Sequence, residues 1–154
     1  GTLSSRSCSK FFSPSLLEVL CIHKNMTQLA TQDYIASSPQ ESLSLARPME
    51  SSPFVLGLQA SAKDNNLAIN VSIHVPTASG KMANRSIWVN ERGEIESYYD
   101  KLHLFDYGSL RESNSVDGGK EIVKPVETVM GRVGLMICFD VCSLVACLCF
   151  SAPI

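Results

Sequence analysis

The sequence has 154 residues, 45% of them hydrophobic and 18% charged, which is the composition of a globular chain of about one domain. Its net charge of −2 at pH 7 excludes the basic surface that nucleic acids or anionic membranes require. Six cysteines, four of them after residue 137, lack the spacing of a structural zinc site or of a distributed disulfide framework. The composition therefore predicts a reduced, cytoplasmic protein.

The first half of the chain contains two predicted helices. Residues 1–32 show no hydrophobic period and are expected to be poorly structured, although their serine-rich, acid-poor start also resembles a mitochondrial transit peptide. A short helix is expected at 39–47. A second helix begins at Ser51 or Ser52, before Pro53, and ends at residues 65–66. Its spacing predicts a buried side made of Phe54, Leu58 and Ala62.

Alternating apolar residues then predict strands at 67–75, 85–91 and from 94 onward, the last running out into a loop at 101–105, joined by tight turns into antiparallel hairpins. A polar loop is expected at 106–121, followed by a strand at 121–128. The run 133–139 is almost continuously apolar, which is typical of a strand covered on both faces. Helices followed by such a strand indicate an α/β layer architecture. The apolar tail at 141–150 is far shorter than the about 20 residues that cross a bilayer, so a membrane span is disfavoured.

Three residues could carry chemistry, although each alone has an ordinary structural interpretation. Cys138 lies at the end of the predicted buried strand, where open α/β sheets present functional groups, but such a cysteine is more often a small buried hydrophobe. Lys101 lies at a strand end, where lysines are usually solvated. Glu112 lies in a loop, where a carboxylate usually faces water.

Together these residues stand in motifs of a known family. The segments "YYDKLHLFD", "RESNS" and "GRVGLMICFD" occur here in the order and approximate spacing of the nitrilase, or carbon–nitrogen hydrolase, superfamily. The similarity extends upstream through "NNLAINVSIHVPT" and "DYIASSPQESLSLARP", and covers residues 33–140. It most resembles the branch containing deaminated glutathione amidase, with omega-amidase as a near relative.

This resemblance implies an α-β-β-α sandwich and a catalytic set of Cys138, Lys101 and Glu112. Cys138 matches the nucleophile, which forms an acyl-thioester with a small linear amide of the 2-oxo acid type. Lys101 matches the lysine that stabilises the oxyanion. Glu112 matches a second glutamate that positions this lysine. The resemblance implies no metal or organic cofactor, and a homodimer is typical of the superfamily.

The sequence departs from the family pattern at both ends. The position of the family's general-base glutamate falls near Ala30, and an alanine cannot accept the thiol proton. After "CFD" the chain lacks the "RFPE" continuation, and the loop between Lys101 and Glu112 is shortened. We therefore predict a divergent segment at 1–32, a partial sandwich at 33–140 that lacks its carboxy-terminal half, and a non-family hydrophobic tail at 141–154. Little or no turnover is expected. The alternative is a catalytically inactive fragment that binds a full-length paralogue.

Overall fold

The computed structural model describes residues 38–128 and 130–142, with the side chains of Leu110, Val141 and Cys142 excepted. The segment 1–32, including Ala30, lies outside the described residues, as does most of the tail at 141–154. The divisions predicted for both ends of the chain therefore stay predictions.

Both helices form where local signals place them. Helix α1 spans Pro39–Leu45, and the Ser38 hydroxyl accepts a hydrogen bond from the Glu41 amide at 3.2 Å. After the 3₁₀ turn η1 (Met49–Ser51), helix α2 spans Pro53–Asn65. Ser52 caps its amino end, and Asn66 ends it in the left-handed conformation with φ of 50°.

The buried side of α2 differs from the prediction. Val55 and Ala62 are its fully buried residues, whereas Phe54 is only partly buried and Leu58 is half-buried. Apolar side chains surround the first turns of this helix, so their spacing alone does not identify the side that faces the sheet.

The three predicted strands form one antiparallel sheet in the order β1-β2-β3. Strand β1 spans Ile69–Pro76, β2 spans Met82–Val89 and β3 spans Ile95–Asp100. Strand β2 begins three residues before its predicted start, and β3 ends at Asp100, where the predicted strand runs out into a loop. Helix α2 covers one face, where an apolar core forms from Val55, Ala62, Ile73, Val75, Ala83, Ile87 and Val89.

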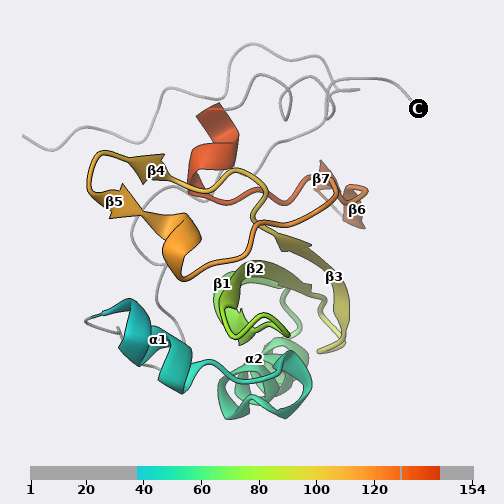
Figure 1. Ribbon diagram of the computed structural model, residues 1–154. Coiled ribbons are helices and arrows are strands. Elements are labelled where there is room, and N and C mark those ends of the chain that lie inside the picture. The colour runs from blue at the N-terminus through green and yellow to red at the C-terminus, as the bar shows by residue number, and fades with distance from the viewer. Residues whose placement is uncertain (1–37, 129, 143–154) are drawn as a thin grey trace, which may run out of the picture.

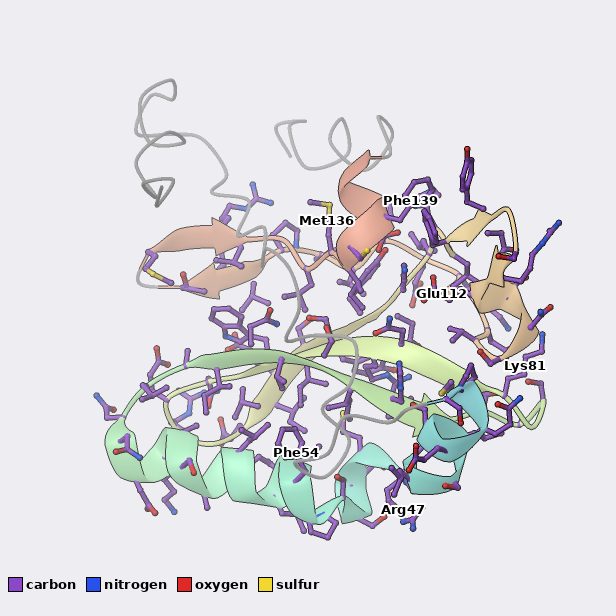
Figure 2. All side chains as sticks on the ribbon, turned by 90° about the vertical axis from the view of Figure 1, so that its left-hand side faces the viewer. Arg47, Phe54, Lys81, Glu112, Met136 and Phe139 are labelled. Carbon is purple, nitrogen blue, oxygen red and sulfur yellow. The ribbon has the colours of Figure 1, made fainter. Side chains whose placement is uncertain are left out.

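The opposite face of the sheet carries shorter elements. The predicted loop at 106–121 contains a small hairpin, with β4 at Asp106–Tyr107 and β5 at Leu110–Arg111, followed by the 3₁₀ turn η2 at Glu112–Asn114. Strand β6 spans Val126–Thr128 and pairs with β7, Gly131–Val133. Figure 2 shows these elements on one side of the sheet and both helices on the other.

The predicted strand at 133–139 is wrong beyond its first residue. Strand β7 ends at Val133, and residues 134–137 have no regular structure before the 3₁₀ turn η3, Cys138–Cys142. The β6–β7 ladder ends at the pair of Val126 and Val133, directly after Pro125, and proline is rarely found inside a sheet. Leu135 and Ile137 are nevertheless buried, in a second core with Trp88, Tyr99, Val126 and Val133.

The described part of the chain is thus a mixed α and β structure, with a helical layer, an antiparallel sheet and a third layer of short elements (Figure 1). None of its helices is long and apolar enough to cross a membrane. The second core anchors the segment before Cys138 to the face of the sheet that α2 leaves uncovered.

Candidate active site

Lys101 follows directly after β3, and its side chain has no exposed surface. Its backbone N–H donates to the Asn84 carbonyl at 2.9 Å, and its own carbonyl accepts from the Gly119 N–H at 2.8 Å. A Cβ on Gly119 would collide with the Asp100 carbonyl, so the close approach of this loop requires glycine. The lysine is therefore held by backbone contacts on both sides.

Glu112 forms an ion pair with this buried lysine. The Lys101 Nζ donates to the Glu112 Oε2 at 2.6 Å, and the same oxygen accepts from the Phe105 N–H at 2.7 Å. The Glu112 N–H in turn donates to the Phe105 carbonyl at 3.2 Å, which closes the base of the β4–β5 hairpin. The structure thus brings two of the three predicted site residues into direct contact.

A row of polar residues crosses the sheet beside this ion pair. His74 on β1 stands opposite Asn84 on β2, and the Asn84 carbonyl accepts the Lys101 N–H. The Ser42 Oγ lies 2.6 Å from the His74 Nδ1, and burial lowers the pKa of this imidazole while the Glu112 charge opposes the shift. Among the described residues, no group hydrogen-bonds to the buried Asn84 Oδ1.

Cys138 lies on the same side of the sheet but does not bond to the ion pair. Its thiol is exposed and its backbone has φ of 50°, a left-handed conformation that is uncommon outside glycine. Within residues 38–128 and 130–142, no hydrogen bond joins this thiol to Lys101 or Glu112. Figure 2 places the neighbouring Phe139 on the Glu112 side of the sheet, opposite Phe54. The Phe139 ring meets Phe105 edge-on, with centroids 5.6 Å apart.

Asp140 and His103 are two polar residues of this region that the sequence analysis left out. The Asp140 side chain is fully buried and accepts hydrogen bonds from both the Cys138 turn and the segment after Lys101. Each stands two residues beyond a predicted site residue, in "CFD" and "KLH". A polar residue at the same short distance from two predicted site residues was the available signal.

A helical layer on an antiparallel sheet, with short elements on the other face, agrees with the fold that the nitrilase resemblance implies. The family model described as carbon-nitrogen hydrolase matches residues 22–143. The chain therefore belongs to the carbon–nitrogen hydrolase family.

Relatives with curated names agree with this family. A Schizosaccharomyces pombe protein described as "Probable hydrolase nit2" is 34% identical over 71% of this chain and 42% of its own length. Deaminated glutathione amidase of Escherichia coli O157:H7 is 37% identical over 56% of this chain and 33% of its own. The chain thus spans about two fifths or less of these relatives' length.

A solved structure supports the nitrilase-type fold. The crystal structure of the Caenorhabditis elegans NitFhit protein superposes with a TM-score of 0.64 and 29% identity, covering 72% of this chain and 29% of that one. The described fold is thus a partial nitrilase-type sandwich, as the sequence predicts.

Proposed function

We propose that the chain hydrolyses small linear amides of the 2-oxo acid type through an acyl-thioester on Cys138. The observation that carries this proposal is the Lys101–Glu112 pair, in which a fully buried ammonium is held at 2.6 Å by a carboxylate. A buried ion pair is weak evidence for a gain in stability, because desolvation offsets its attraction. A role in chemistry explains its retention better, and named relatives such as deaminated glutathione amidase are amidases.

The proposed reaction has two balanced steps. The Cys138 Sγ attacks the amide carbonyl carbon, the C–N bond breaks, and ammonia leaves with the thiol proton. Water then attacks the thioester carbonyl, which releases the carboxylic acid and restores the thiol. Lys101 would stabilise the oxyanion that develops in each step, and Glu112 would hold the lysine in place.

The rate should be low. Because Ala30 stands where the family pattern has its general base, the chain lacks a group that contributes on the order of 10²–10⁴-fold to the rate. We therefore expect slow ammonia release with a detectable acyl-enzyme.

The experiment measures ammonia release from a 2-oxo acid amide, together with the intact mass of the protein during turnover. Cys138→Ala should abolish both ammonia release and the acyl adduct. Lys101→Met should slow acylation by on the order of 10²–10³-fold, as expected for a lost oxyanion donor. The matched control, Lys63→Met in the last turn of α2, removes an exposed ammonium and should leave both unchanged. If the unaltered chain releases no ammonia and forms no adduct, the proposal is overturned and the non-catalytic alternative is favoured.

A further inference from the structure

Asp140 fixes the backbone turn that contains Cys138. Its Oδ2 accepts the Ile137 N–H at 3.1 Å, and its own N–H donates to the Ile137 carbonyl at 3.1 Å. These two bonds close the tripeptide around Cys138, whose φ is 50°. A non-glycine residue in this conformation costs roughly 1–2 kcal/mol, so it persists only where its surroundings impose it. The buried Asp140 carboxylate provides that restraint.

The same carboxylate also holds the segment around Lys101. The Asp140 Oδ1 accepts the His103 backbone N–H at 2.8 Å and lies 3.0 Å from the His103 Nδ1. The Tyr99 hydroxyl, on the other side of Lys101, accepts the Leu102 N–H at 3.1 Å. Tyr99 and His103 stand two residues before and two residues after Lys101. One carboxylate therefore connects the thiol-bearing turn to the segment that follows the lysine.

We propose that Asp140 is a positioning residue that sets the Cys138 turn relative to Lys101. This inference rests on the proposed function, because it assumes that Lys101 stabilises the carbonyl oxygen of a molecule that reacts with the Cys138 thiol. An apolar side chain could fill the same space without the penalty of burying a charge. A buried carboxylate with hydrogen bonds in several directions specifies one arrangement of the groups that donate to it.

The experiment compares two alkylating reagents at Cys138. Iodoacetamide carries an amide oxygen two bonds from the carbon that the thiolate attacks, whereas iodomethane has no oxygen. A lysine positioned beside the thiol should therefore accelerate the first reagent relative to the second. The ratio of the two rates is measured at Cys138 by peptide mass spectrometry of the full chain, with glutathione as the reference thiol.

In the unaltered chain, we expect the ratio of the iodoacetamide rate to the iodomethane rate at Cys138 to exceed the ratio measured for glutathione. In Lys101→Met, the two ratios should be equal. Asp140→Asn should lower the ratio on the order of tenfold, the rate equivalent of about one lost hydrogen bond, with little change in the iodomethane rate. Because Asp140 acts through Lys101, Asp140→Asn should have no further effect in the Lys101→Met background.

Two further variants keep this test decisive. Asp117→Asn is the matched control, because the Asp117 carboxylate accepts hydrogen bonds from the Thr77 and Ser79 hydroxyls rather than from the Cys138 turn, and its loss should leave the ratio unchanged. If Asp140→Asn does not fold, His103→Ala removes a partner from the Lys101 side alone and should lower the ratio less.

The outcomes separate the two proposals. An unchanged ratio in Lys101→Met would overturn the proposed function itself. A ratio that falls in Lys101→Met but in neither Asp140→Asn nor His103→Ala would overturn the positioning role alone. An equal fall in both reagent rates would also overturn it, since that result describes a general change in thiol exposure.

Discussion

At the scale of single residues, the face of the sheet opposite α2 is defined by buried polar groups. His74, Asn84 and Lys101 are all buried there, although none of the three is a usual core residue. Such groups are tolerated inside a protein only when their hydrogen bonds are met or when function retains them. His74 is the member whose protonation is expected to report on this environment.

The fold should lose stability as the pH falls below about 6.5, the ordinary pKa of histidine, because His74 is buried. Burial lowers the pKa of His74 in the folded state, with Glu112 opposing the shift. As the pH is lowered, the unfolded chain therefore takes up the proton at a higher pH than the folded chain does. The free energy of unfolding decreases over this range, until the pH has passed below the folded-state pKa. Urea unfolding at pH values from 7.5 to 5 measures this slope.

His74→Gln is the control for this dependence. Glutamine keeps a hydrogen-bonding group towards Ser42 but does not titrate, so its slope over the same pH range should be shallower. Contributions from other titrating groups appear in both proteins and cancel in the difference between them. Equal slopes in the two proteins would contradict the assignment of the effect to His74.

At the scale of elements, features fixed by neighbours in the sequence were predictable and features fixed by distant partners were not. Both helices could be predicted because serine, proline and asparagine mark their ends locally. The strand at 133–139 failed because β7 pairs with the three residues of β6, and the residue before them is Pro125.

The candidate site divides in the same way. The motifs identified Lys101 and Glu112, and the structure joins them. The contacts of Asp140 with His103 were not predictable, because they link residues 37 positions apart that meet only in the fold.

The face of α2 that packs on the sheet can be tested with two neighbouring residues. Val55 has no exposed surface, whereas Leu56 is 51% exposed. Val55→Ala should destabilise the fold by about 2 kcal/mol, through lost burial and the cavity that remains. Leu56→Ala should change the free energy of unfolding by less than about 0.5 kcal/mol, although it removes more atoms. Urea unfolding of both variants measures the contrast, and similar losses in the two would show that the helix packs through a different side.

At the scale of the whole molecule, the three layers should differ in stability. Strand β2 pairs on both sides, with eight residue pairs to β1 and five to β3, and lies over the α2 core. The hairpin of β4 and β5 has two residue pairs, and both residues of β4 are exposed. Backbone hydrogen bonds with little burial around them open locally, without unfolding of the rest.

Amide hydrogen exchange, followed by mass spectrometry, should resolve this difference. Peptides from β2 are expected to exchange on the order of 10²-fold or more slowly than peptides from the β4–β5 hairpin, because β2 must wait for global unfolding. Glu112 follows that hairpin directly, so the carboxylate of the ion pair belongs to the less stable layer while Lys101 is anchored to the sheet. Lys101→Met should accelerate exchange in the hairpin without altering β2, since it removes the ion pair that fastens Glu112 to the sheet. Uniform protection across both regions would mean that the third layer unfolds together with the sheet, and that the lysine and its carboxylate are held as one unit.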